Sequence, residues 1–405
     1  MPRAEEERMG LAGLEIAVVG AGIGGLAAAV ALAQRGARVR VFEQASALGE
    51  VGAGIQIGPN GVAVLAALGL YDAAAARASL PQAVALVDFR RNRPVARLRL
   101  GQAAARQDRP YWHLHRADLL AVLEAGAAGA DVRLTLGAAV LGVEPDGAGL
   151  RVRTLEGDAG RFAAVVAADG VRSPLRAAHF AAAPARFTGH VAWRALVPAD
   201  RTPAAFLQPE ARVTMAPGRH LVSYPLRGGT LVNLVGVEER RAWAEEGWSL
   251  RDDPANLRRA FAGWAGPAAE LVASVEDCWL WGLFDHPPLR SWVAGRTVLL
   301  GDACHPMLPF LAQGATMALE DAWVLADRLD RAADPAVGLA TYEATRLPRA
   351  TRVQRAAAQA GRLYHLRAGL REPAHAGLRM ASRLAPGLIE RRFDWIYRHD
   401  VTATG

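Results

Sequence analysis

The stretch LEIAVVGAGIGGLAAAVALAQRGARVRVFE, from Leu14 to Glu43, contains the patterns of a strand, a helix and a second strand in that order. An apolar run ends at Gly20, an Ala-rich helical pattern follows to about Arg35, and the residues from Val39 onward alternate as they do in a strand. The stretch therefore predicts a βαβ unit, which indicates an α/β fold.

Three glycines of this unit, Gly20, Gly22 and Gly25, have the G-x-G-x-x-G spacing of a dinucleotide-binding turn. The first allows a tight turn, the second lets the backbone approach a pyrophosphate, and the third lets helix and strand pack closely. Free N–H groups at the start of the helix then face the phosphates. Glu43 ends the second strand, where a carboxylate can bind a ribose hydroxyl. Such glycines also occur by chance in ordinary turns, but strand, turn, helix and acid occur together here, which favours dinucleotide binding.

The length and composition of the chain indicate a large globular protein. Its 405 residues are 52% hydrophobic, which is enough for a sizeable core and too much chain for one simple domain. The formal net charge of +7 comes mainly from arginines that are scattered along the chain. Nucleic-acid binding needs clustered basic residues, so we expect no nucleic-acid partner.

Cysteine use and hydropathy predict a cytoplasmic protein. The two cysteines, Cys278 and Cys304, form no CxxC pair and fit a reducing compartment. The first 13 residues lack the apolar core of a signal peptide, and no unbroken apolar run approaches 18 residues. We therefore expect no integral membrane segment.

Two further segments follow apolar strands and contain an aspartate next to a glycine. Asp169–Ser173 reads DGVRS, and Gly301–Pro306 reads GDACHP. Ligands of open α/β sheets bind beyond the carboxyl ends of the strands, so these two segments and the glycine turn are expected to surround one long cofactor. An ordinary turn is the alternative for each of them taken alone.

A different pattern, mainly of alternating strands, fills the segment from Phe187 to Val237. It predicts an antiparallel sheet with one face covered, which suits the wall of a substrate domain. We therefore predict a Rossmann-like cofactor domain, interleaved with a substrate domain built on a mixed or antiparallel sheet and followed by C-terminal helices. The predicted divisions are 1–82, 101–184 and 285–350 for the cofactor domain, 83–100 and 185–284 for the substrate domain, and 351–405 for the helices.

Together these segments resemble the FAD-dependent aromatic hydroxylases, single-component flavoprotein monooxygenases such as the salicylate, 3-hydroxybenzoate and 6-hydroxynicotinate hydroxylases. The glycine turn, DGVRS and GDACHPMLPFLAQGA stand in the family's order and approximate spacing. The resemblance extends from Ile16 to about Ala350. It implies a FAD-binding domain of the glutathione-reductase type that holds FAD noncovalently.

The resemblance also implies roles for individual residues around FAD. Asp302 would hold the ribityl chain, and Arg116 would contact the flavin nucleotide. Asp169 and Arg172 would serve both FAD and the transient docking of NADH or NADPH. Pro309 would pack near the isoalloxazine ring.

The reaction implied by the resemblance is hydroxylation of a small aromatic ring. FAD reduced by NADH or NADPH would react with dioxygen to a flavin hydroperoxide, which transfers one hydroxyl to a phenol or hydroxylated N-heteroaromatic of acidic character. A helix that opens near Gly314 and Ala315 would stabilise negative charge beside the flavin carbonyl. We expect no metal, because the ten histidines show no ligand spacing with acids or cysteines.

On the substrate side, His220 and Tyr224 lie four residues apart in a predicted strand, so their side chains share a face. The resemblance assigns such a pair to the substrate pocket as catalytic residues, either orienters or a base relay; a pair packed on a sheet face is the alternative. Arg194 is a candidate to bind a substrate carboxylate, with an outward, solvated arginine as the alternative. Gln56 is a candidate for the substrate side of the flavin, and His305 is expected to be positional rather than catalytic.

Two other functions remain open from the sequence. One is a flavin-dependent reductase or dehydrogenase without oxygen transfer, and the other is a non-enzymatic flavin redox sensor. The absence of a CxxC pair and of a second glycine fingerprint argues against the disulfide-reductase type. The expected partners are a small aromatic substrate, dioxygen and NAD(P)H, and the expected state is a monomer or a homodimer.

Overall fold

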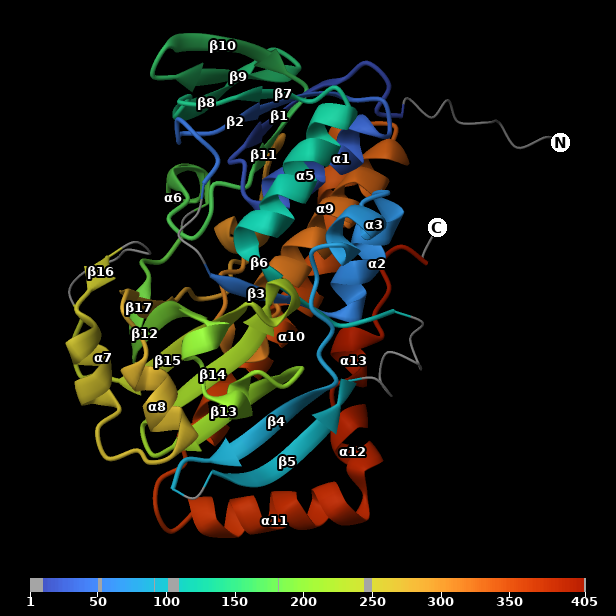
Figure 1. Ribbon diagram of the computed structural model, residues 1–405. Helices are drawn as coiled ribbons and strands as arrows, with labels where there is room; N and C mark the ends of the chain where they lie inside the picture. Colours follow the sequence, from blue (N-terminus) through green and yellow to red (C-terminus); the bar gives the residue numbers. More distant parts are fainter. Residues whose placement is uncertain are drawn as a thin grey trace, which may run out of the picture.

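A six-stranded sheet forms the upper part of the molecule, seen in a computed structural model that describes residues 10–49, 53–90, 92–100, 109–180, 182–243 and 250–403 (Figure 1). Neighbouring strands are parallel, except that β18 runs antiparallel to β19. The order is β18 (Val293–Ala294), β19 (Thr297–Leu299), β11 (Ala164–Ala167), β1 (Glu15–Val19), β2 (Arg38–Phe42) and β7 (Arg133–Thr135).

The helices beside this sheet pack closely because small residues face one another. Helix α1 (Ile23–Ala33) lies between α5 (Arg116–Gly129) and α9 (Gly314–Asp330). A Cβ on Gly24 would lie 2.7 Å from the Cδ2 atom of Leu300 and 3.2 Å from the Cβ atom of Ala318, so a larger side chain would separate α1 from α9. Helix α2 (Pro59–Ala67) packs against α9, and α3 (Tyr71–Ala75) packs against α2 and α5.

A small antiparallel sheet extends the upper part of the molecule (Figure 1). Its order is β10 (Gly157–Phe162), β9 (Gly149–Thr154) and β8 (Val140–Asp146), with a hairpin turn between β8 and β9. Helix α6 (Pro174–His179) follows the DGVRS segment.

An eight-stranded sheet forms the lower part and contains the predicted alternating strands. All its neighbours are antiparallel except β13 and β4. Helices α7 (Pro254–Ala260) and α8 (Pro267–Ala273) bury apolar side chains against one face. The order is β16 (Arg251–Asp252), β17 (Cys278–Asp285), β12 (Arg186–Pro198), β15 (Leu231–Glu239), β14 (Arg219–Leu226), β13 (Glu210–Ala216), β4 (Ala83–Asp88) and β5 (Arg93–Arg99).

A two-stranded sheet and a long helix join the two parts. Strand β3 (Gly54–Ile57) pairs antiparallel with β6 (Trp112–His115), and the amide of Gly54 donates to Oδ1 of Asn233 in the large sheet at 2.7 Å. Helix α10 (Pro335–Tyr364) packs on α9 at one end and reaches the large sheet at the other. The chain ends with α11 (Arg371–Leu384), α12 (Pro386–Arg391) and α13 (Asp394–Tyr397).

The predicted α/β fold class, with an interleaved sheet domain and C-terminal helices, is confirmed. Strand β6 continues to His115, and α5 begins directly after it at Arg116. Pairing with β3, a contact distant in sequence, stabilises β6. The division of the chain into domains stays a proposal, and α10 runs through residue 350 without a break. Within the described ranges, no helix combines the length and apolar character needed to cross a membrane.

Candidate active site

A cavity of about 620 Å³ lies between the six-stranded and eight-stranded sheets, lined by segments that follow strands of the first and by strand residues of the second. The glycine turn and the segments after β11 and β19 line one side, where the parallel strands end. Strands β12, β14, β15 and β17 of the large sheet line the other side. The three predicted loops therefore do surround one space.

The glycine turn is built as its spacing predicts. Gly20 has φ +101°, and a Cβ there would lie 2.4 Å from the carbonyl oxygen of Ala168, while a Cβ on Gly25 would lie 1.9 Å from the carbonyl oxygen of Gly20. Nothing lies within 4 Å of a Cβ placed on Gly22, which faces the cavity and begins α1 without a side-chain cap. The first amides of α1 are thus left to an anion that enters the cavity.

The carboxylate of Glu43 lies directly against this turn. Its Oε2 accepts from the amide of Ala21 at 2.7 Å and its Oε1 accepts from the amide of Ala45 at 2.9 Å. The hydrogen bonds fix the carboxylate beside the turn, and its predicted contact with a ribose stays a prediction.

The two aspartate segments contribute differently. Asp302 lines the cavity, together with Arg116 and Arg172. The side chain of Asp169 lies behind the lining, where its Oδ2 accepts from the amide of Leu175 at 3.2 Å and helps to cap α6. Burial raises the pKa of Asp169. Its predicted contact with FAD stays a prediction.

The N-terminus of α9 opens onto the same cavity. Gly314 and Ala315 line it, with Pro309 of the preceding turn, and α9 has no side-chain cap at its start. Uncapped amides and the helix dipole make this end electropositive. Arg176, which the sequence did not reveal, also lines the cavity and donates to the carbonyl oxygen of Ala303 at 3.2 Å.

His220 and Tyr224 lie on β14, and both line the cavity as the strand periodicity predicts. Both are buried, at 1% and 4% exposure. Burial lowers the pKa of His220, with additional effects of His365 and His190, so the imidazole is neutral near pH 7. Burial also raises the pKa of Tyr224, which keeps its phenol protonated.

Gln56 and Arg194 complete this side of the cavity. The hydroxyl of Tyr111 donates to Oε1 of Gln56 at 2.8 Å, which fixes the amide at the end of β3. The guanidinium of Arg194 lies over the ring of Trp281, 4.4 Å from its centre, and faces the cavity rather than bulk solvent. The four predicted substrate-side residues therefore share one cavity.

His305 points away from the cavity, into a buried cluster of charges. Its Nε2 bonds to Asp321, which also accepts from Nε of Arg346 at 2.7 Å. Arg346 pairs with Glu320 at 2.6 Å as well, so α9 and α10 are tied together behind the cavity. The positional role expected of His305 agrees with this placement.

A cluster of His190, Glu239 and His365 lies next to His220, and sequence reasoning missed it. One ligand-type atom from each of the three lies within 4.8 Å of the others. His365 follows the last residue of α10 and lies 126 positions from Glu239 and 145 from His220. Contacts at such separations leave no local pattern in a sequence.

Comparisons with known proteins agree with this geometry. Residues 13–357 match the family described as FAD binding domain. The chain is 39% identical to 3-amino-4-hydroxybenzoate 2-monooxygenase PtmB3 of Streptomyces platensis, over 96% of this chain and 97% of that protein. It is 36% identical to 3-hydroxybenzoate 6-hydroxylase of Polaromonas naphthalenivorans, over 87% and 89%. Klebsiella pneumoniae HpxO, solved with FAD and uric acid, superposes with a TM-score of 0.81 at 29% identity, over 93% and 95%.

The cavity fits FAD. The open space at Gly22 and the uncapped start of α1 suit a pyrophosphate, and arginines 116, 172 and 176 bring positive charge to the lining. The electropositive start of α9 lines the same cavity as the substrate-side residues. An extended dinucleotide can therefore span from the glycine turn to the large sheet.

Proposed function

Because the chain belongs to the FAD-dependent aromatic hydroxylases, we propose that it hydroxylates a small aromatic acid that carries a phenolic hydroxyl, with dioxygen and with NADH or NADPH as reductant. FAD is its cofactor. One observation supports the proposal most strongly. The neutral His220, the protonated Tyr224 and Arg194, all on the large sheet, line the same cavity as the three loops predicted to bind the cofactor.

The proposed substrate class follows from the charges of the cavity. Arg194, held flat on Trp281, suits a carboxylate, because a guanidinium matches the geometry of two carboxylate oxygens. Apolar and aromatic residues make up much of the remaining substrate side and suit a flat ring. The two relatives act, by their names, on 3-amino-4-hydroxybenzoate and 3-hydroxybenzoate, each of which carries a carboxylate and a phenol. We therefore propose a hydroxybenzoate or an amino-substituted hydroxybenzoate.

His220 and Tyr224 act on the phenol in this proposal. FAD, when bound, supplies the oxygen activation, and the ring must be electron-rich to receive the oxygen. His220 accepts the phenolic proton, because burial keeps the imidazole neutral and able to act as a base. Tyr224, with its pKa raised, remains a hydrogen-bond donor that orients the ring.

The remaining residues bind and position. The first amides of α1 hold the pyrophosphate, Glu43 the ribose, and Asp302 the ribityl chain. The start of α9, at Gly314 and Ala315, favours negative charge near the flavin carbonyl. Arg172 is proposed to serve the docking of NADH or NADPH. The large sheet forms one wall of the cavity, a wall that is proposed to limit the access of water to the ring.

The proposal is tested by incubating the purified flavoprotein with NADH or NADPH, oxygen and a panel of hydroxylated benzoates, aminobenzoates and pyridines. We expect at least one acidic phenol to stimulate reductant oxidation and to give a ring with one added hydroxyl. Reductant oxidation that yields peroxide alone for every ring would reject hydroxylation and favour a reductase.

A further inference from the structure

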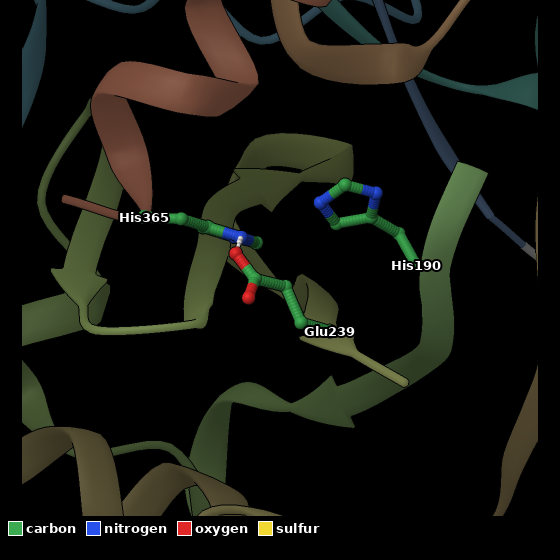
Figure 2. A group of neighbouring side chains, drawn as sticks. All are labelled: His190, Glu239 and His365. Carbon is green, nitrogen blue, oxygen red and sulfur yellow. Dashed lines mark hydrogen bonds and ion pairs between the residues drawn. The ribbon is translucent and has the colours of Figure 1, made fainter. Parts of the chain in front are cut away.

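A line of hydrogen-bonded side chains leads from the substrate side of the cavity to the protein surface. Nδ1 of His220 lies 2.6 Å from Nε2 of His365, and Nδ1 of His365 lies 3.1 Å from Oε1 of Glu239. His220 and His365 are buried, whereas the side chain of Glu239 is 36% exposed. Figure 2 shows the hydrogen bond between His365 and Glu239, with His190 facing the pair from the side.

Three separate elements build this line. His220 lies on β14, Glu239 is the last residue of β15, and His365 follows α10. The rings of Phe310 and Tyr364 lie 5.4 Å and 5.2 Å from the ring of His220. These aromatic neighbours shield the buried end of the line from water, so a proton leaves His220 most directly along the line itself.

The hydrogen bonds allow one arrangement of protons when both histidines are neutral and Glu239 is ionised. An ionised carboxylate only accepts, so Nδ1 of His365 carries its proton. Nε2 of His365 is then unprotonated and accepts from Nδ1–H of His220. Nε2 of His220 is left unprotonated, which is the state that a general base requires.

We propose that His365 and Glu239 form a proton relay that carries the substrate's phenolic proton from His220 to solvent. The phenolic O–H bond breaks as an N–H bond forms at Nε2 of His220. The proton on Nδ1 of His220 passes to Nε2 of His365, and the proton on Nδ1 of His365 passes to Glu239 and then to water. No electrons are transferred, and one proton leaves for each phenolate formed. The relay rests on the proposed function, in which His220 accepts that proton.

The surroundings of the line suit this role. Burial lowers the pKa of His365 to about 4, so both imidazoles are neutral between proton transfers. The other titratable or charged groups that face the line are His190 beside both imidazoles, Tyr364 beside His220, Arg219 near His365, and Arg367, whose Nη2 lies 3.5 Å from Oε2 of Glu239. The guanidinium of Arg367 brings positive charge to the outer end of the line.

A metal site made of His190, Glu239 and His365 is the competing explanation of this cluster. Coordination by His365 would need the lone pair of its Nδ1, but that nitrogen donates to Oε1 of Glu239. The other carboxylate oxygen, Oε2, already contacts Arg367. The two explanations differ at His190, whose Nδ1 bonds to Thr188 at 3.2 Å. A metal site needs His190, whereas the relay does not.

The experiment measures proton release when a phenolic ring binds to the oxidised holoenzyme. The ring is chosen because its binding perturbs the flavin absorbance, and the solution is weakly buffered. After rapid mixing, the absorbance of a pH indicator follows proton release, and the phenolate absorbance follows deprotonation of the ring. The variants are His365→Asn, which still reaches Glu239 but not His220, and Glu239→Gln, at the exposed end of the line. His190→Asn is the matched control. Melting temperature and FAD content are measured for every variant.

For the unaltered protein we expect about one proton released per bound ring. In His365→Asn and Glu239→Gln the release slows by about 10-fold or more, and imidazole added to His365→Asn restores it. His190→Asn behaves as the unaltered protein does. Unchanged release in both relay variants, or no rescue by imidazole in a folded His365→Asn, would overturn the relay.

If proton release slows in His190→Asn as much as in His365→Asn, and if a chelator also slows it in the unaltered protein, the relay is overturned and a metal site is established. Failure of the proposed function is distinguishable, because proton release requires no turnover. Release along the line without any hydroxylated product would leave the relay intact and reject hydroxylation.

Discussion

Arg194→Met removes the charge proposed to bind the substrate carboxylate while keeping a long side chain against Trp281, where the guanidinium now lies 4.4 Å from the ring centre. A hydrogen bond to a charged group contributes about 1.5–3 kcal/mol. Loss of that contribution weakens binding by about 10- to 150-fold, at about 1.4 kcal/mol for each factor of ten. The same substitution weakens the binding of a phenol that lacks a carboxylate much less.

The assay is a titration of the oxidised holoenzyme, followed by the flavin absorbance, with a hydroxybenzoate and with the matching phenol that lacks the carboxylate. Arg240→Met is the control, because Arg240 also stacks on a tryptophan, 4.9 Å from the ring centre of Trp193, but does not line the cavity. An equal loss of affinity for both ligands in Arg194→Met, or an equal loss in Arg240→Met, would refute the assigned role.

Three further predictions concern the cofactor turn, the buried charges and pH. Gly25→Ala places a Cβ 1.9 Å from the carbonyl oxygen of Gly20, and the strain of about 1–3 kcal/mol should weaken FAD binding by about 5- to 150-fold, measured by flavin content after dialysis. Arg346→Met removes a buried guanidinium that pairs with both Glu320 and Asp321, of which Glu320 keeps Arg349, and should lower the free energy of unfolding by about 3–5 kcal/mol in urea, whereas an unchanged midpoint contradicts this. Burial lowers the pKa of His113 to about 3, so between pH 6.5 and about 3 the unfolded chain binds a proton that the folded chain does not. Stability should fall on acidification by up to about 1.4 kcal/mol per pH unit from this residue, and His113→Asn should reduce that slope in urea titrations.

The parts of the fold that could be predicted from sequence are those with local patterns. The βαβ unit follows from a periodicity confined to Leu14–Glu43, and the shared face of His220 and Tyr224 follows from the strand repeat of two. The short strands β3 and β6 were not predicted, because each is stabilised by pairing across more than 50 residues, as with Gln56 and His113. Their local sequences carry too little signal to compete with the helical pattern that follows.

The site was predictable where one segment contributes a whole motif. The loop from Asp302 to Pro309 and the glycine turn are such segments, and both line the cavity or support its wall. His365 was not predictable, because it joins His220 only through the length and direction of α10. A contact of that kind depends on how a 30-residue helix packs against a distant sheet, which no local spacing specifies.

The proposed reaction transfers one atom of dioxygen to a phenolic acid. Turnover under 18O-labelled dioxygen, followed by mass spectrometry of the product, tests it most directly. We expect a ring that carries one labelled hydroxyl, formed together with the oxidation of NADH or NADPH. A product whose new hydroxyl carries unlabelled oxygen from water, or labelled peroxide with no labelled ring, would contradict it.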